Sequence, residues 1–353
     1  MKARLAVALL ASALAGGAVL PAHAAAQSDI LLRLRSGSPL GDRFRVDSAS
    51  GFVAKGVLGI GIIPFTGAGE RLTWHPYKAA FRAGSIGSAG TQWDDANTGF
   101  YSWAGGYNTT AQGLSSFAIG YQSSATGSYA SAMGYTANAT GTGSVALGYR
   151  VTADADYSVA IGQRASANGH AGAIVLSDGS TTDSTQASAN NQFSVRAAGG
   201  IRLFTNALMT TGVQVAAGGS SWAVISDRNR KQDFLAVNGE DLLGRIRGIP
   251  VTTWRLRTEE DRTVRHIGPM AQDWHRAFGF NSDSTTINMS DFDGVNLAAI
   301  QALEARTAEL QASNRELQAR TAEVGQLRSE LDATRRQLEE LQAAVRRLQE
   351  ARH

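Results

Sequence analysis

The sequence contains no cysteine, so no disulfide can stabilise any part of its 353 residues. A chain of this length can form two or three domains, and these must gain stability from burial or from association with other chains. Beyond Ala24 no stretch approaches the ~18 apolar residues that cross a bilayer as a helix. We therefore expect no membrane-spanning segment in the mature chain.

The net charge of the chain is small. The formal net charge is +3, and the arginines are mixed with acidic residues instead of gathering in a patch. This distribution disfavours nucleic-acid binding. Lysine is the rarest cation, since it occurs only at Lys2, Lys55, Lys78 and Lys231, whereas arginine is common throughout. Lys231 is thus the only lysine after Lys78.

The start of the chain, 1–24, has the form of a secretory signal. A basic start, Met1–Arg4, precedes the apolar stretch Leu5–Leu20 and the small-x-small sequence Ala22-His23-Ala24 that signal peptidase recognises. A membrane anchor is disfavoured because the apolar stretch is short and two glycines interrupt it. We expect export, with Ala25 as the first mature residue and the periplasm, cell surface or exterior as the destination.

The middle of the chain repeats itself at a fixed period of fourteen positions, in five copies from Ser102 to Ala171. The residues that recur in register are Gly106, Gly120, Gly134, Gly148 and Gly162, and then Ala111, Ala125, Ala139, Ala153 and Ala167. A fixed short period indicates a stack in which each copy contacts its neighbours. One period fits two strands of about five residues and two tight turns, with the glycines supplying the positive φ of the turns.

These repeats carry small inward residues and little charge. The charged residues across the five copies are Arg150, Asp154, Asp156 and Arg164. Alanine at the inward positions predicts a narrow coil that buries little apolar surface, so we expect it to pack against copies of itself. A disordered Gly/Ser/Thr linker is disfavoured by the strict register of the large apolar residues.

The repeats resemble the head of trimeric autotransporter adhesins, a left-handed parallel β-roll with the pattern Ser-x-Ala-(Ile/Leu)-Gly. The similarity covers roughly residues 103–176 and implies a trimeric, mainly β stalk, whose surface or glycan ligand stays unidentified. Those adhesins end in a short membrane anchor, whereas this chain ends in a charged helical segment. We therefore expect no anchoring by that route.

The last region has a heptad pattern. The residues seven apart are Leu303, Leu310, Leu317, Val324, Leu331, Leu338 and Val345, and the second apolar positions are Leu327, Leu341 and Leu348. Polar residues hold the second position upstream, which is compatible with a register change near Val324. A helix folded onto its own domain is disfavoured because seven heptads exceed the usual globular length. The pattern predicts an oligomerisation helix.

Lys231 stands five positions after Ser226, in Ser226-Asp227-Arg228-Asn229-Arg230-Lys231-Gln232. Arginine cannot give up its proton, whereas a buried amine can, and it can then accept the proton of a serine hydroxyl. Ser226 and Lys231 are therefore a candidate nucleophile and base. On these residues alone the preferred interpretation is simpler, with Ser226 or Asp227 capping a helix whose first turn holds an exposed lysine.

Further motifs follow in order. Leu242, Leu243 and Ile246 indicate a helix, residues 251–256 a strand, and Trp274 with Phe278 an amphipathic helix. The order Ser-Asp-x-x-x-Lys, then His-Ile-Gly-x-x-Ala-Gln from His266 onward, then a helix resembles the C-terminal intramolecular chaperone domain of phage endosialidases and tail fibres. The similarity covers roughly residues 221–310.

This resemblance implies a domain that trimerises, helps an upstream β-rich stalk to fold, and then cuts itself off. It implies Ser226 and Lys231 as the catalytic dyad, with cleavage between Ile225 and Ser226, and it reverses the preference for a simple helix cap. The supporting positions that match are Asp227, His266 and Gln272. Gln232 stands where relatives often have an acidic residue, which alters the charge around Lys231.

The spacing of five also constrains the geometry. On one continuous helix the two side chains would diverge by about 140°. With Ser226 in an extended lead-in and Lys231 in the first helical turn, the neutral amine can accept the serine proton. The serine oxygen then attacks the Ile225 carbonyl, and water opens the ester. Backbone N–H groups of the helix start would steady the oxyanion. His266 has two possible roles, as a proton donor or as a structural residue that holds the adjacent turn, and the structural role is at least equally favoured.

Other patterns indicate no site. Gly56-x-x-Gly59-x-Gly61 is interpreted as turns because Pro64 intervenes and no helix pattern follows. Asp291-x-Asp293-Gly294 lacks the other ligands of a calcium loop and is predicted to be a turn. His266 and His275 lack a third ligand at metal spacing. We expect neither a metal nor a cofactor.

The predicted fold is a mainly β repeat stalk, left-handed, β-roll-like and trimeric, then a small α+β chaperone domain and a coiled-coil helix. The predicted segments are a signal peptide at 1–24, a β-rich region at 25–101, the β-roll at 102–176, a β-rich connector at 177–220, the self-cleaving chaperone at 221–300 and the coiled coil at 301–353.

The leading hypothesis is an exported homotrimeric fibre or adhesin-like protein whose C-terminal domain chaperones assembly and cuts itself once, with no other substrate. The alternative is a structural or adhesive surface protein whose C-terminal domain only trimerises. A glycan-active enzyme has little support, because residues 27–100 contain no clear pair of catalytic carboxylates.

Overall fold

The structure is a computed structural model that describes residues 30–36, 41–47, 51–63, 65–280 and 282–351. These residues form two compact units. The first ends at Ile201 and also includes Val215–Ser221, and the second comprises Arg202–Gln214 and the chain from Trp222 onward. The signal peptide predicted at 1–24 lies outside the described residues and stays a prediction. Within the described ranges, no helix is both long enough and apolar enough to span a bilayer.

The first unit begins with antiparallel strands. Its first sheet has the order β1 (Ile30–Ser36), β2 (Gly41–Asp47), β3 (Phe52–Ala54). Next, β4 (Gly69–His75) pairs antiparallel with β5 (Ala80–Ile86) across the 3₁₀ turn η1 (Pro76–Lys78). A second 3₁₀ turn, η2 (Asp95–Asn97), follows, and β5 pairs with the first strand of a parallel stack.

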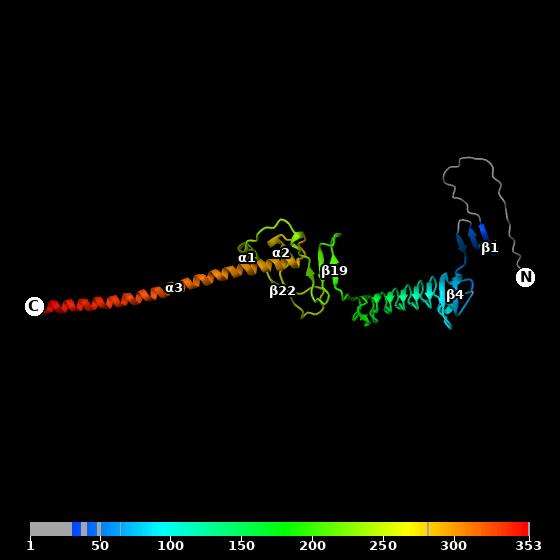
Figure 1. The fold of residues 1–353 in the computed structure, drawn as a ribbon, viewed down its shortest axis with the longest axis horizontal. Coiled ribbons are helices and arrows are strands. Elements are labelled where there is room, and N and C mark those ends of the chain that lie inside the picture. Colours follow the sequence, from blue (N-terminus) through cyan, green and yellow to red (C-terminus); the bar gives the residue numbers. More distant parts are fainter. Residues whose placement is uncertain (1–29, 37–40, 48–50, 64, 281, 352–353) are drawn as a thin grey trace, which may run out of the picture. The chain divides into compact units, whose positions relative to one another are not determined.

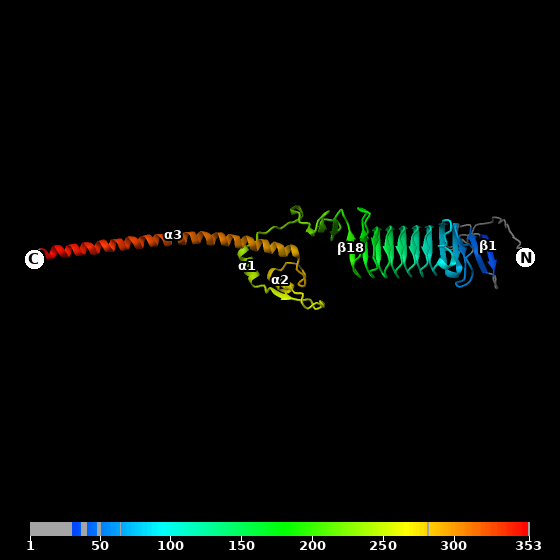
Figure 2. The ribbon, with the colours of Figure 1, turned by 90° about the horizontal axis from the view of Figure 1, so that it is seen from below.

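That stack is a parallel β-coil, seen as successive turns in Figures 1 and 2. Its longer strands are β6 (Trp103–Tyr107), β8 (Phe117–Tyr121), β10 (Ser131–Tyr135), β12 (Val145–Tyr149), β14 (Val159–Gln163), β16 (Ile174–Ser177) and β18 (Phe193–Arg196). Its shorter strands are β7 (Thr110–Ala111), β9 (Ser124–Ala125), β11 (Asn138–Ala139), β13 (Thr152–Ala153), β15 (Ala165–Ser166) and β17 (Thr185–Gln186). The predicted parallel coil is therefore confirmed.

The strand register reproduces the sequence repeat. Ala118 pairs with Ala132, and Ala132 with Ala146, so each residue faces its equivalent in the next copy. The shorter strand of each turn is only a residue pair, and not the longer strand that the sequence predicts. The stacking also continues past the predicted end of the β-roll at residue 176, because β18 joins the same sheet beside β16. The chain between these last strands is longer than one repeat, so the last turns are wider.

Alanine fills the interior of the coil, as the sequence predicts. Ala118, Ala132 and Ala146 are fully buried, and the core of this unit consists largely of such residues. At the turns, the buried hydroxyls of Ser144 and Ser158 donate to the carbonyls of Gly141 and Ala155 at 2.7 and 2.6 Å. A narrow interior therefore leaves room mainly for methyl groups and a few hydroxyls, of which those of Ser144 and Ser158 find partners nearby.

The recurring glycines serve a purpose other than the expected one. They lie inside the strands, where Gly134 has a φ of +129° and a Cβ on it would come within 2.0 Å of the Gly148 carbonyl oxygen. The tight turns instead use other residues in the left-handed region, which repeat at Asn108, Gln122, Thr136, Arg150 and Arg164. The glycines are needed because successive turns of backbone approach each other too closely for a Cβ.

The side chains outside the coil form apolar rows that a single chain leaves exposed. Tyr107, Tyr121, Tyr135 and Tyr149 stack face to face, with ring centroids 5.0–5.1 Å apart. Each of these rings remains between 37% and 41% exposed. Contiguous exposed apolar surface of this kind marks an interaction site.

The second unit contains a three-stranded sheet and three helices. Its elements are β19 (Ile201–Phe204), β20 (Gly212–Val215), β21 (Ala223–Val224), η3 (Arg228–Arg230), α1 (Gly239–Arg247), β22 (Thr252–Trp254), β23 (His266–Gly268), α2 (Ala271–Phe278) and α3 (Met289–Glu350). Leu242, Trp274 and Val295 join α1, α2 and the start of α3 in one core. The predicted helices around Leu242 and Trp274 are confirmed.

One expectation for this unit is wrong. Asp291, Asp293 and Gly294 lie in the first turns of α3, not in a separate turn. Asn288 provides the helix cap, because its side chain accepts from the Ser290 N–H at 2.9 Å. With this cap in front of it, the acidic segment continues into the helix, where negative charge is favourable near the N-terminus.

The rest of α3 continues as a single helix to Glu350 (Figure 1). Its heptad residues are largely exposed in one chain. Leu310, Leu338 and Leu348 are 64%, 56% and 69% exposed. Thr307 and Thr321 bond their hydroxyls to carbonyls one turn back, at 2.7 Å each. The predicted register change near Val324 stays a prediction.

We predict that Gly134→Ala destabilises the coil by roughly 3 kcal/mol, because it adds both positive-φ strain and a clash with backbone. The matched control is Gly143→Ser, since Gly143 has a φ of +63° at a turn position where an earlier repeat already has Ser115. This control should change stability by less than about 1 kcal/mol. Thermal unfolding followed by circular dichroism checks both, and equal losses would contradict the close-approach argument.

Candidate functional site

The candidate dyad lies on a short turn that follows a strand. Ser226 comes two residues after β21 in a segment without regular structure, and Arg228–Arg230 then form the single 3₁₀ turn η3. Lys231 ends this turn with extended dihedral angles, φ −121° and ψ 152°. The expected position of Lys231 within the first turn of a helix is therefore wrong, because the turn closes before it.

The turn nevertheless brings the two side chains together. Lys231 Nζ lies 2.6 Å from Ser226 Oγ, within hydrogen-bonding distance. A charged amine donates in this contact, and an uncharged amine in the same place can accept the serine proton. Both side chains are exposed in a single chain. The arrangement can therefore serve as a nucleophile and base when the amine is uncharged.

Asp227 shapes the turn. Its carboxylate accepts from the Asn229 N–H at 2.9 Å and lies 3.5 Å from Arg230 Nε. This is the capping geometry expected of an aspartate before a helical turn. Because the Asn229 N–H is engaged by this carboxylate, it is unavailable as the oxyanion donor that the sequence argument placed at the helix start.

Two contacts that sequence analysis missed fasten this turn to the strands before it. The Ile225 N–H donates to the Gly212 carbonyl at 3.3 Å, and Arg230 Nη1 donates to the Thr210 carbonyl at 3.0 Å. Thr210 lies between β19 and β20, and Gly212 is the first residue of β20. No sequence signal could single out Arg230, since it is one of many arginines and its partner is a backbone carbonyl.

In the described part of the chain, His266 and Gln272, the other two predicted supporting residues, form no hydrogen bond with Ser226 or Lys231. His266 Nε2 bonds to Glu259 Oε1 at 2.6 Å, and its ring centroid lies 4.7 Å from that of Trp254. The hydrogen bond from His266 is the main cause that holds the pKa of Glu259 below its ordinary value. Gln272 is exposed in the first turn of α2. The contacts of His266 thus favour its structural role, in closing the loop between β22 and β23.

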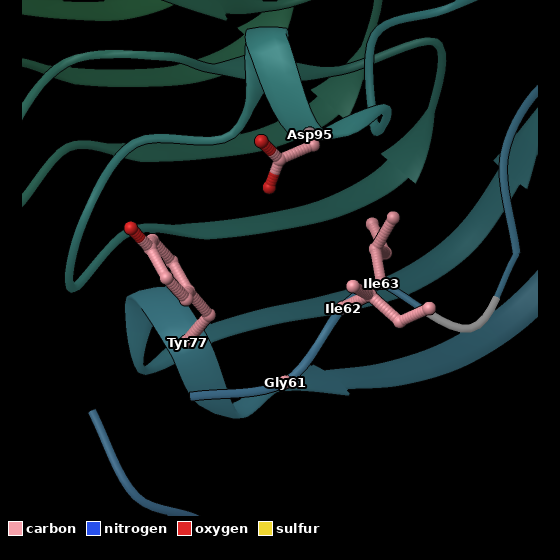
Figure 3. Close-up of a pocket in the computed structure, with 5 residues that line it drawn as sticks. All are labelled: Gly61, Ile62, Ile63, Tyr77 and Asp95. Atoms are coloured by element: carbon pink, nitrogen blue, oxygen red, sulfur yellow. The ribbon is translucent and has the colours of Figure 1, made fainter. Parts of the chain in front are cut away.

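A separate cavity of about 360 Å³ lies in the first unit. Its walls, drawn in Figure 3, come from Gly61, Ile62, Ile63, Tyr77 and Asp95. The Asp95 carboxylate already has partners, since His75 Nε2 lies at 2.7 Å and Lys78 Nζ at 3.4 Å. Within the described ranges, no group of three or more His, Asp or Glu residues is placed to hold a metal ion.

Comparisons with known families assign the two regions. Residues 226–280 match the family described as chaperone of endosialidase, and the matched segment begins at Ser226. The second unit contains this chaperone domain. Residues 98–123, 125–150 and 152–173 match the YadA head domain repeat, which agrees with the turns of the coil. No curated protein and no solved structure matches the chain.

We predict that His266→Phe raises the pKa of Glu259 toward its ordinary value, because phenylalanine keeps a ring against Trp254 but donates no hydrogen bond. The folded chain holds this pKa low, so the contact stabilises it at neutral pH and the gain is lost as the pH falls through the folded pKa. Titration by carboxyl carbon NMR measures the shift. Asp261, whose lowered pKa depends on Thr263, is the internal control and should not move.

Proposed function

We propose that this chain is an exported, homotrimeric, fibre- or adhesin-like protein whose C-terminal unit chaperones assembly and then cuts the chain between Ile225 and Ser226. The observation that carries the proposal is the 2.6 Å contact between Lys231 Nζ and Ser226 Oγ. It lies at the first residue of the segment matched to the chaperone family. Both partners come from one chain, which supports cleavage in cis.

The reaction requires a single proton carrier. Uncharged Lys231 takes the hydroxyl proton of Ser226, and the serine oxygen bonds to the Ile225 carbonyl carbon. As the peptide C–N bond breaks, the lysine proton passes to the departing nitrogen, leaving an ester and a free amine on Ser226. Water then adds to the ester through the same base, giving an Ile225 carboxylate and restoring the hydroxyl. One turnover ends the reaction, because substrate and catalyst separate.

Assembly would supply the missing condition for this chemistry. Lysine acts as a base only when it is uncharged, and burial away from water favours the uncharged amine. The dyad is exposed in one chain, while apolar residues next to it, Phe234, Leu235 and Val237, are 63%, 90% and 65% exposed. We infer that packing of these side chains between copies covers the dyad, so that cleavage follows association.

Association is also what the stalk requires. In the coil, neighbouring turns have near-identical sequences and pair in the same register, so a slip of one whole turn between chains would cost little. The heptad residues of α3 provide an alignment that does not depend on the repeats. Trimerising through the helix first would fix the register of the coil, and removing the helix afterwards would make assembly irreversible.

For cleavage, we predict that purified wild-type protein yields a fragment beginning at Ser226. Ser226→Ala and Lys231→Ala should slow its formation by at least ~10²-fold, because each removes a partner of the proton transfer. Lys231→Arg should be equally slow, since a guanidinium keeps the charge but cannot act as a base. Intact mass and N-terminal sequencing measure the products.

The control for these variants is Ser221→Ala, which removes a serine just ahead of the cut and should leave cleavage unchanged. Wild-type chains that stay intact after assembling would exclude the self-cutting mechanism. A fragment in Lys231→Arg would exclude this lysine as the base.

For assembly, we predict that Leu331→Asp lowers the fraction of trimer at a given concentration in the uncleaved Ser226→Ala chain. The substitution places three carboxylates together on the apolar seam of α3, where repulsion and desolvation oppose association. Ala333→Asp, two positions away on the same helix, is the matched control and should leave the trimer intact. Sedimentation velocity measures the trimer fraction, and a fraction unchanged by Leu331→Asp would contradict assembly through α3.

A second candidate function is a fibre whose C-terminal unit trimerises without cutting. The exposure of both Ser226 and Lys231 in a single chain favours it, because a solvated lysine is a poor base. Under this function the coiled coil stays covalently attached in mature protein. The same mass measurement distinguishes the two.

A further inference from the structure

The hairpin formed by β19 and β20, residues 202–214 of the second unit, contacts the chain on both sides of the predicted cut. On the upstream side, β20 pairs with β21, where Val213 faces Val224 and Gln214 faces Ala223. The Ile225 N–H continues this pairing by donating to the Gly212 carbonyl at 3.3 Å. The residue whose carbonyl would be attacked is therefore the last one held by the sheet.

On the downstream side, the hairpin tip receives Arg230. Its Nη1 donates to the Thr210 carbonyl at 3.0 Å, and Arg230 is the last residue of η3, directly before Lys231. The same side chain lies 3.5 Å from the Asp227 cap. Arg230 therefore links the turn that carries the base to the element that holds the acyl side of the bond.

Hydrogen bonds within the hairpin tip hold the Thr210 carbonyl in place. Asn206 Oδ1 accepts from the N–H groups of Thr210 and Thr211 at 2.9 and 3.0 Å, and its Nδ2 donates to Thr210 Oγ1. The Thr205 N–H donates to the Thr211 carbonyl at 3.0 Å, which closes the turn. Asn206 thereby fixes the Thr210 peptide in one orientation.

We propose that this hairpin is part of the cleavage machinery, with Arg230 as a positioning residue that clamps the catalytic turn against the strand ahead of the cut. The proposal rests on the self-cleavage proposed above and names what controls it. Because carbonyls of this hairpin accept one hydrogen bond from each side of the Ile225–Ser226 bond, cleavage waits until the hairpin has formed. The hairpin lies upstream of the cut and remains with the stalk. The chaperone is therefore released only after this part of the stalk has folded.

The first test compares first-order cleavage rates of full-length assembled chains. Arg230→Ala should cut about tenfold more slowly, the effect of losing one hydrogen bond from a charged donor. Arg230→Lys should recover much of the rate, because an ammonium group can reach the same carbonyl. Arg228→Ala is the matched control, an arginine of the same turn whose guanidinium lies over Phe234 at 5.8 Å, and it should cut at the wild-type rate.

The pH profile separates positioning from proton transfer. Arg230→Ala should lower the rate by the same factor at every pH, since the proton carrier is unchanged. A profile that shifts along the pH axis, an unchanged rate, or an equal slowing in Arg228→Ala would overturn the clamp. If wild-type protein is not cut at all, self-cleavage fails and the clamp falls with it, whereas normal cutting in Arg230→Ala overturns the clamp alone.

A second variant covers the case in which Arg230→Ala does not assemble. Asn206→Ala leaves the catalytic turn untouched but releases the Thr210 peptide, and it should also slow cleavage. In the uncleaved Ser226→Ala background, the same change should speed hydrogen exchange of the Ile225 amide. The proposal would be contradicted if Asn206→Ala were cut at the wild-type rate, or if it left the exchange rate of the Ile225 amide unchanged.

Discussion

The close approach of successive backbone turns in the β-coil is the constraint on which the stalk depends. A Cβ at Gly134 would lie 2.0 Å from the carbonyl of the next turn, so this spacing admits only glycine there, and the core inside the coil consists largely of alanine. A core of methyl groups buries little apolar area per residue. The stalk must therefore gain stability from its outer face, where a single chain leaves aromatic and aliphatic rows uncovered.

The C-terminal helix also leaves a row of apolar residues uncovered in a single chain. The first turns of α3 pack into the small core around Trp274, but its heptad residues from Leu303 to Leu348 remain between 46% and 69% exposed in one chain. An extended helix with an apolar seam is marginal alone and becomes stable when several seams meet. In the proposed trimer, the coil associates through a repeating surface, whereas the helix associates through a seam with a defined register.

Between them, the candidate dyad depends on a very small piece of local structure. One 3₁₀ turn, capped by Asp227, reverses the chain enough for Lys231 to reach Ser226. An exposed pair of this kind is poor at proton transfer, and burial improves it. In the proposed mechanism, burial on assembly therefore activates the dyad, and the β19–β20 hairpin makes cleavage depend on the folding of the strand ahead of the cut.

Sequence alone determined the features that repeat or that follow from residue type. The period of the repeats, the alanine interior, the heptad seam and the Ser226–Lys231 pair could be read directly, because periodicity and a scarce lysine are visible without contacts. Only the tertiary structure shows what each residue does. The recurring glycines lie in strands and not in turns, and Asp291 and Asp293 lie in α3. His266 contacts Glu259, and Arg230 donates a hydrogen bond to the Thr210 carbonyl. These contacts depend on backbone atoms that the fold brings together from distant positions. Because every residue has a backbone carbonyl, residue type alone cannot show which carbonyl accepts a hydrogen bond.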